Sequence, residues 1–178
     1  MREGAANRLL KAAEMLSNKH YLVVFDAWRP YEVQLELYRR LKEELQAKRI
    51  LNIEKELSLY VDTPSKDAMK PSNHLTGGAI DLTIATKEVH LNMGTCFDDF
   101  SEGSRTDAYE NMTDLNDEEL LIRENRRMLK RIMENAGFAN YSEEWWHYDY
   151  GNQNWAKSVG KHMAFYRGVL KLKDHIKV

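Results

Sequence analysis

Two short segments of this chain carry residues that could bind a metal ion, and the first of them spans Ser72 to Asp81. It reads SNHLTGGAID, so a Gly-Gly pair separates His74 from Asp81. On one unbroken strand, positions seven apart face opposite sides, but a glycine-rich corner lets the loop histidine fold back toward the strand carboxylate. Both side chains could then reach one ion at the ~2.0–2.2 Å that zinc requires.

The second segment, EWWHYDY, begins at Glu144 and offers a third ligand. A catalytic zinc site takes three protein ligands and leaves one position for water. His147 lies in a strand-like run whose alternation puts it on the same side as Asp149. If Glu144 lies in the preceding turn, its carboxylate would stand beside that water without ligating the ion. The sequence therefore predicts hydrolytic chemistry with Glu144 as base and one zinc ion per chain, with these ligands: His74, Asp81 and His147.

Structural roles for the histidines are the alternative. A lone histidine beside a Gly-Gly turn is more often structural than metal-binding, and the second segment is what favours a ligand role for His74. His90 is the nearest competing ligand, since it follows Asp81 by only nine positions. We expect the remaining histidines on the surface or in packing: His20, His90, His162 and His175.

Composition narrows the class of protein and of partner. The 178 residues include 26 basic and 28 acidic side chains, with no long block of one sign, so nucleic acid is not an expected partner. Cys96 is the sole cysteine, which excludes an internal disulfide and a cysteine-based zinc site. The longest apolar run, Tyr21 to Phe25, is far shorter than the ~20 residues that cross a bilayer, so no membrane partner is expected.

The beginning of the sequence bears on location. It reads MREGAANRLLKAAEML, which lacks the apolar core of a secretory signal and is typical of an amphipathic helix. We therefore expect a cytoplasmic protein. A signal removed during processing would instead place it in the periplasm.

The elements that must position these residues follow from hydrophobic periodicity. The first half predicts a helix, a strand, a second helix and a broken helix that leads into a loop, over these ranges: Ala5 to Leu16, Tyr21 to Asp26, Tyr31 to about Gln46, and Lys48 to Lys70. Ala79 to Ile84 alternates, which predicts a half-buried strand with Asp81 on its polar face.

The second half begins with a long loop over Asn92 to Tyr109, and long loops in compact domains are often functional. A helix follows, capped by Asn116 and ended by Gly137. Its apolar face is expected to include Leu121, Met128, Leu129, Ile132, Met133 and Ala136. A closing helix is expected over Trp155 to Leu170. The order predicts an α+β fold, with helices packed on a small, mostly antiparallel sheet.

At this point the residues match a known family. The pattern S-x-H-x-x-G-x-A-x-D at 72–81, followed by E-x-x-H at 144–147, resembles the D-alanyl-D-alanine dipeptidases. These are related to D,D-carboxypeptidases, phage peptidoglycan endopeptidases and the hedgehog amino-terminal domain. Three further segments resemble the dipeptidase branch: DAWRP at 26–30, MGTCFD at 93–98 and WWHY at 145–148. The likeness spans residues 5–170 and implies a hedgehog/D,D-peptidase-like fold.

The resemblance implies hydrolysis of the free dipeptide D-alanyl-D-alanine, in altering or recycling cell-wall precursors. It implies zinc at His74, Asp81 and His147, with Glu144 as general base and acid. Arg29 would polarise the scissile carbonyl, and Ser72 and Asp98 would hold the substrate's amino group. Aromatic side chains such as Trp28, Tyr148 or Trp146 would confine the substrate's methyl groups. Preference for D-residues enters through the resemblance alone.

Several alternatives stay open on the sequence. Arg29 could simply pair with Asp26, Asp98 could be a turn residue, and the aromatic residues could belong to the core. The same zinc site could serve a D,D-carboxypeptidase or peptidoglycan endopeptidase, or a noncatalytic zinc-binding domain, although the latter needs neither Glu144 nor Arg29. We expect one domain over 1–178, with an N-terminal segment shorter than in the family.

Overall fold

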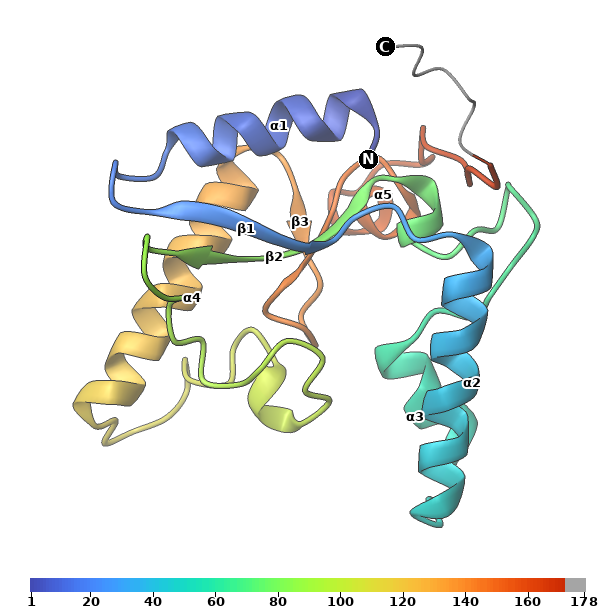
Figure 1. The fold of residues 1–178 in the computed structure, drawn as a ribbon, viewed down its shortest axis with the longest axis horizontal. Coiled ribbons are helices and arrows are strands. Elements are labelled where there is room, and N and C mark those ends of the chain that lie inside the picture. Colours follow the sequence, from blue (N-terminus) through green and yellow to red (C-terminus); the bar gives the residue numbers. More distant parts are fainter. Residues whose placement is uncertain (172–178) are drawn as a thin grey trace.

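The computed structural model describes residues 1–171, and its centre is a four-stranded antiparallel sheet (Figure 1). His175 lies outside the described residues. In spatial order the strands are β1 (Tyr21–Asp26), β2 (Ala79–Ala85), β4 (His147–Asp149) and β3 (Ala139–Asn140). The predicted α+β class with a mostly antiparallel sheet is confirmed.

The central strand β2 is buried on both faces, so the prediction of a half-buried strand was wrong. Ile80, Leu82 and Ile84 point into the main core. Asp81 lies on the opposite face, where its carboxylate contacts His74 and His147 instead of solvent. The strand's alternation was read correctly, but the polar face is covered by the candidate site.

Two helices cover the core face of the sheet. They are α1 (Glu3–Glu14), which lies above β1 and β2 in the view of Figure 1, and α4 (Asp117–Asn135). Ala12 of α1 and Met133 of α4 are fully buried in the cluster that contains the β2 isoleucines and leucine. The predicted ends of α4 are confirmed, because Asn116 forms a capping box with Glu119 and Gly137 follows the helix with φ +95°.

One residue assigned to the buried face of α4 is misplaced. Leu121 is 56% exposed, whereas its neighbour Ile122 is 5% exposed and packs inward. Arg126 also lies on the buried face, at 3% exposure. At the start of the helix the buried face is therefore rotated by about one residue from the predicted one. This buried face also includes an arginine.

Two further helices stand apart from α1 and α4. Figure 1 shows α2 (Tyr31–Ala47) and α3 (Ile53–Tyr60) side by side, projecting away from the sheet. Two polar contacts tie this pair to other segments: Gln34 Nε2 donates to the Asp62 carbonyl at 2.7 Å, and the Tyr141 hydroxyl donates to the Leu59 carbonyl at 3.0 Å. The helix predicted from Tyr31 to about Gln46 is confirmed as α2. The broken helix and loop predicted over Lys48 to Lys70 are confirmed as α3 and the irregular chain after it.

The prediction of a closing helix over Trp155 to Leu170 was wrong. Only α5 (Gln153–Ser158) is helical, and the chain then runs irregularly to residue 171. The backbone amides of Phe165 and Tyr166 both donate to the Gly151 carbonyl, at 3.0 and 2.9 Å. This contact turns the chain back over the end of the sheet, which a continuing helix could not do.

No helix among residues 1–171 combines the length and the apolar character needed to cross a bilayer.

Candidate metal centre and cleft

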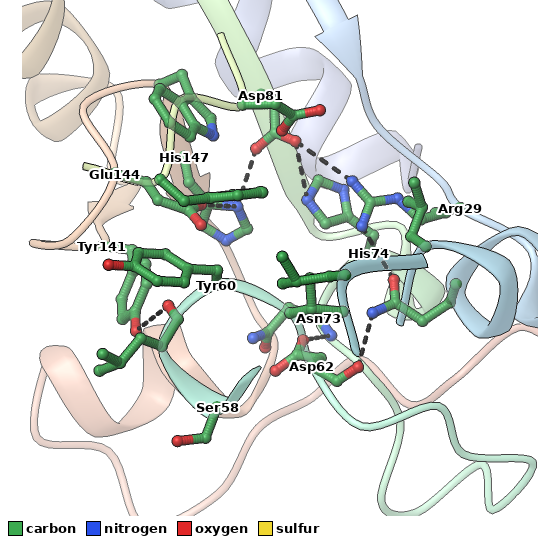
Figure 2. A pocket seen from close by; sticks show the side chains of 18 of the residues that line it. Arg29, Ser58, Tyr60, Asp62, Asn73, His74, Asp81, Tyr141, Glu144 and His147 are labelled. Atoms are coloured by element: carbon green, nitrogen blue, oxygen red, sulfur yellow. Dashed lines mark hydrogen bonds and ion pairs between the residues drawn. The ribbon is translucent and has the colours of Figure 1, made fainter. Parts of the chain in front are cut away.

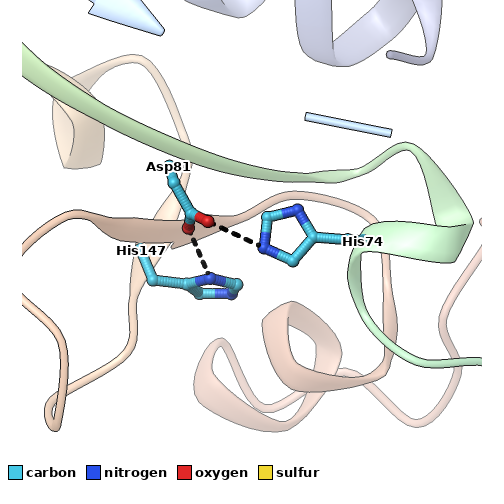
Figure 3. A group of neighbouring side chains, drawn as sticks. All are labelled: His74, Asp81 and His147. Carbon is cyan, nitrogen blue, oxygen red and sulfur yellow. Dashed lines mark hydrogen bonds and ion pairs between the residues drawn. The ribbon is translucent and has the colours of Figure 1, made fainter. Parts of the chain in front are cut away.

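Three side chains meet at the junction of β2, β4 and a short 3₁₀ helix, η1 (His74–Thr76). Asp81 and His147 are direct partners in the antiparallel register of β2 and β4. Gly77 has φ +70° and turns the chain from η1 into β2, as the glycine corner in the sequence predicts. One nitrogen or oxygen atom from each of these three residues lies within 4.8 Å of the others (Figure 3): His74, Asp81 and His147.

The donor atoms suit a cation. His74 Nδ1 is 2.8 Å from the Ala27 carbonyl, so this nitrogen carries the proton and Nε2 presents a lone pair. That lone pair faces Asp81 Oδ2 at 3.2 Å, and the other Asp81 oxygen lies 2.9 Å from His147 Nδ1. Two imidazoles and one carboxylate, all buried, form a donor set that zinc uses in its catalytic sites.

The charge state of Asp81 is favourable to a cation. Burial by itself would raise the pKa of this carboxyl, but the two imidazoles that lie against it, those of His74 and His147, hold the pKa well below its usual range. Asp81 is therefore ionised at neutral pH despite being 2% exposed. A buried carboxylate needs such partners, because an isolated one would become protonated.

A second carboxylate lies behind His147, and it is not among the residues predicted for the site. Asp149 Oδ1 is 3.2 Å from His147 Nε2, the ring nitrogen that faces away from Asp81. Asn152, at the start of α5, donates a hydrogen bond from its side chain to the same oxygen. Both residues are at most 2% exposed. The alternation of the strand, which puts Asp149 on the His147 side, was the signal available in the sequence.

Glu144 lies beside the three converging residues and outside their group. It follows a turn in which its amide donates to the Tyr141 carbonyl at 3.1 Å, and Glu144 Oε2 is 3.8 Å from His147 Nδ1. Burial raises the pKa of Glu144 to about 8; His147 acts in the opposite direction, and Asp81 adds to the increase. Glu144 therefore lies in the turn before His147, as expected for a carboxylate that stands beside the ion without ligating it.

Arg29 reaches the same centre from the loop after β1. Its Nε donates to Asp26 at 2.7 Å, its Nη1 donates to Gln34 Oε1 at 3.0 Å, and its Nη2 lies 3.6 Å from Asp81. The pairing with Asp26, left open by the sequence, does form. It holds the guanidinium in place and still leaves Nη2 directed toward the candidate ligands.

These residues line one end of a cleft with a volume of about 430 Å³ (Figure 2). Of the four expected substrate-binding residues, Asp98 and Trp146 line the cleft. Ser72 and Tyr148 do not line it: they are 3% and 1% exposed, and Ser72 Oγ has no hydrogen-bond partner among the described residues. Burial raises the pKa of Asp98 to about 6, and the charge of Asp81 adds to this increase.

The loop that carries Asp98 is held by Arg126, a second residue that is not among those predicted for the site. The guanidinium donates to three backbone carbonyls, those of Met93, Arg105 and Gly103, at 2.7, 2.6 and 2.7 Å. Burial lowers the pKa of Arg126 to about 10, which leaves it charged at neutral pH. The signal available in the sequence was helical spacing: Arg126 is three positions before the buried Leu129, so both lie on the same face of α4.

Comparison with known proteins gives a consistent result. Residues 1–165 match a family model, peptidase family M15, described as D-ala-D-ala dipeptidase. The chain is 29% identical over 175 residues to a D-alanyl-D-alanine dipeptidase of Synechocystis sp. (88% of this chain, 71% of the relative) and 34% identical over 152 residues to one of Enterococcus faecium (80% and 69%). It is 32% identical over 129 residues to one of Escherichia coli K12 (72% and 54%).

Proposed function

Since the chain belongs to peptidase family M15, the D-ala-D-ala dipeptidases, we propose that it hydrolyses the free dipeptide D-alanyl-D-alanine with one bound zinc ion. The observation that carries the proposal is the convergence of His74, Asp81 and His147 beside the carboxylate of Glu144. A purely structural zinc site would be closed by a fourth protein ligand. Here the fourth neighbour is a carboxylate suited to proton transfer.

Zinc is proposed because two imidazole nitrogens and one carboxylate are ligands typical of its hydrolytic sites. When bound, zinc supplies a water of lowered pKa and a Lewis acid for the scissile carbonyl. The three side chains offer His74 Nε2, the Asp81 carboxylate and His147 Nδ1 for this purpose.

Two side chains of the protein would carry out proton transfer and stabilisation of the developing charge. Glu144 accepts a proton from the attacking water and delivers it to the leaving amine, a role that contributes ~10²–10⁴ in rate. Its burial favours the second half of this role, delivery of the proton to the leaving amine, because a raised pKa makes the protonated form accessible near neutral pH. Arg29, oriented by Asp26 and Gln34, meets the charge that develops on the carbonyl oxygen.

The two ends of the substrate need separate partners. Asp98 lines the cleft at the end that holds Asp81 and Arg29, whose charges act on its carboxyl, and it would pair with the substrate's amino group. Trp146 lines the same end and would confine a small side chain. Ser72 would contribute only if the backbone around it opened toward the cleft.

The test is an assay of the zinc-loaded protein against D-Ala-D-Ala, L-Ala-L-Ala and a pentapeptide ending in D-Ala-D-Ala. Cleavage of the first alone supports the proposal. Cleavage of the pentapeptide would make the chain a D,D-carboxypeptidase or endopeptidase, and no cleavage by a metal-loaded sample would favour a noncatalytic zinc-binding domain. Elemental analysis, with chelation and zinc addition, tests the identity of the metal.

A role in modifying or recycling cell-wall precursors and a cytoplasmic location belong to the same proposal. D-alanyl-D-alanine is a unit of those precursors, and a dipeptidase acts on it in its free form. Cell fractionation with an antibody against the chain tests the location.

A further inference from the structure

Trp28 does not line the cleft, although it is among the aromatic residues predicted to confine the substrate. Its half-buried indole contacts the C-terminal part of the chain instead, where Nε1 donates to the Val169 carbonyl at 3.0 Å. The two residues are 141 positions apart in the sequence. The bond therefore joins the loop after β1 to a segment that carries none of the site residues.

The two neighbours of Trp28 in the sequence both contact His74. The Ala27 carbonyl lies 2.8 Å from His74 Nδ1, and the Arg29 amide donates to the His74 carbonyl at 3.3 Å. The first contact keeps the proton on Nδ1 and so leaves Nε2 free for a metal. Arg29 also directs Nη2 toward Asp81. The backbone of residues 27–29 therefore sets the position of one candidate ligand and of the guanidinium.

Regular secondary structure does not hold this loop. Residues 27–30 lie between the end of β1 and the start of α2. The pairing of β1 with β2 is already irregular between Val24 and Asp26. Bonds to other segments must therefore fix the path of the loop, and the indole of Trp28 supplies one of them.

Val169 connects the loop to the segment that carries His74. Its carbonyl accepts the bond from Trp28, and its amide donates to the Leu75 carbonyl, in the middle of η1, at 2.8 Å. The preceding residue, Gly168, is buried, and its amide donates to the Ala68 carbonyl at 2.8 Å. Residues 168–169 are thus anchored on their own, and they join the loop to η1 a second time, apart from the direct contacts with the histidine.

We propose that Trp28 is a positioning residue, whose bond to Val169 holds residues 27–29 against η1 and thereby fixes both the His74 ring and the Arg29 guanidinium. Residues 168–169 then support the site although they line no part of the cleft. The effect on Arg29 rests on the proposed peptidase function, whereas the effect on His74 concerns metal binding alone.

Trp155 provides a matched control. Its Nε1 also donates to a backbone carbonyl, that of Gly137, at 3.0 Å, and its side chain is half-buried as well. Trp28→Phe and Trp155→Phe remove the same indole N–H and the same part of a ring. Both should lower Tm by ~2–4 °C, which is the effect of losing one hydrogen bond anywhere in a fold of this size.

Zinc affinity and turnover distinguish positioning from this general loss of stability. Competition with a chromophoric chelator, well below Tm, should show zinc binding weakened ~10-fold by Trp28→Phe, because the His74 ring loses part of its support. At saturating zinc, kcat for D-Ala-D-Ala should fall ~10-fold, since small displacements of an oriented group reduce turnover strongly. KM should change little, because Asp98 and Trp146 lie outside the loop. Trp155→Phe should alter none of these quantities.

The outcomes separate this inference from the proposed function. Weaker zinc binding in Trp28→Phe alone supports the positioning role even if no peptide is cleaved, in which case only the peptidase proposal fails. Zinc binding that Trp28→Phe leaves unchanged, or that both variants weaken equally, overturns the positioning role, and cleavage of D-Ala-D-Ala by the unaltered protein then keeps the peptidase proposal. An unchanged kcat at saturating zinc rejects the effect on Arg29. An unaltered protein that binds no zinc rejects both proposals.

Discussion

Asp149 Oδ1 lies 3.2 Å from His147 Nε2, the ring nitrogen that faces away from the candidate metal position. The negative charge of Asp149 and its hydrogen bond raise the pKa of His147, although burial acts in the opposite direction. If the proton of the neutral ring stays on Nε2, Nδ1 is left with a lone pair for a metal. Asp149 thus fixes both the orientation and the tautomer of His147, as carboxylates behind metal-binding histidines commonly do.

We expect Asp149→Asn to weaken zinc binding by ~10–100-fold, because the amide can present its NH₂ to His147 Nε2 and favour the wrong tautomer. Competition with a chromophoric chelator measures this affinity directly, without reference to activity. Asp107→Asn is a suitable control, since Asp107 is a surface carboxylate paired with Arg105. Unchanged zinc affinity in Asp149→Asn would show that the contact does not position His147.

Glu144 and its neighbour Glu143 allow a matched test of the proposed base. Glu144→Gln keeps the size of the side chain but cannot accept a proton, so we expect kcat to fall by ~10²–10⁴ with zinc content retained. Glu143 pairs with Arg105 away from the centre, and Glu143→Gln should stay close to the unaltered protein. A similar loss in both variants, or loss of zinc with Glu144→Gln, would argue against the role of base.

Arg29 should act on turnover more than on metal binding. It approaches Asp81 only at 3.6 Å, so Arg29→Ala removes no candidate ligand. Loss of a preorganised group that stabilises developing charge costs ~3–4 kcal/mol of barrier, or roughly 10²–10³ in kcat. Steady-state kinetics and zinc content measured on the same sample check this. Equal losses of zinc and of activity would instead assign Arg29 to holding Asp81.

Much of the candidate site could be predicted because its residues fall into two pairs, and the members of each pair lie close together in the sequence. The glycine corner and the strand alternation decide how His74 and Asp81 meet, and a short turn decides where Glu144 lies relative to His147. These are relations within about ten residues of the chain. If both segments supply ligands to one ion, the strands that carry Asp81 and His147 must lie close together, as β2 and β4 do.

What could not be predicted depends on contacts between distant segments. Arg126 looks like a solvent-exposed residue of a charged helix until the loop carbonyls of Met93 and Gly103 are placed against it. The end of α5 is similar, since the sequence after Trp155 has helical spacing but the backbone amide of Tyr166 bonds to Gly151 instead. Packing of aromatic side chains overrides local propensity there.

The raised pKa of Asp98 predicts how the free energy of unfolding changes with pH, including the sign of the change. In the folded chain the pKa is about 6, above the ordinary 3.8, so the folded state binds more protons between these values. The stability contributed by this group is therefore lost as pH rises through that window. We expect Asp98→Asn to flatten this part of the pH dependence and to stabilise the chelator-treated protein at pH 7.

Denaturant unfolding at several pH values measures the effect, and Asp99→Asn is the neighbouring control. Asp98 also has φ +60°, a conformation that asparagine tolerates well, so any backbone benefit of the substitution would be the same at every pH. The pH-dependent part alone tests the prediction. Since Asp98 is only partly desolvated and its side chain keeps contact with solvent, the effect should be modest. Equal slopes for Asp98→Asn and the unaltered protein would contradict it.

Arg126 and Arg127 are adjacent in α4 but differ in environment, which makes them a matched pair. Arg126→Met leaves the carbonyls of Met93, Gly103 and Arg105 without their donor, so we expect a loss of ~3 kcal/mol in the free energy of unfolding. Arg127 pairs with Glu110 and Glu124 at the surface, and Arg127→Met should cost at most ~1 kcal/mol.

The same pair of variants tests whether this anchor matters for the cleft. Residues 92–109 carry Asp98, and Arg126 binds the loop on both sides of it, at Met93 and at Gly103. If the loop loosens, Asp98 no longer has a fixed position for the substrate's amino group, so KM should rise more than kcat falls. Assays well below the melting temperature of Arg126→Met isolate this effect. A fall in kcat at unchanged KM would show that Arg126 supports the fold without positioning Asp98.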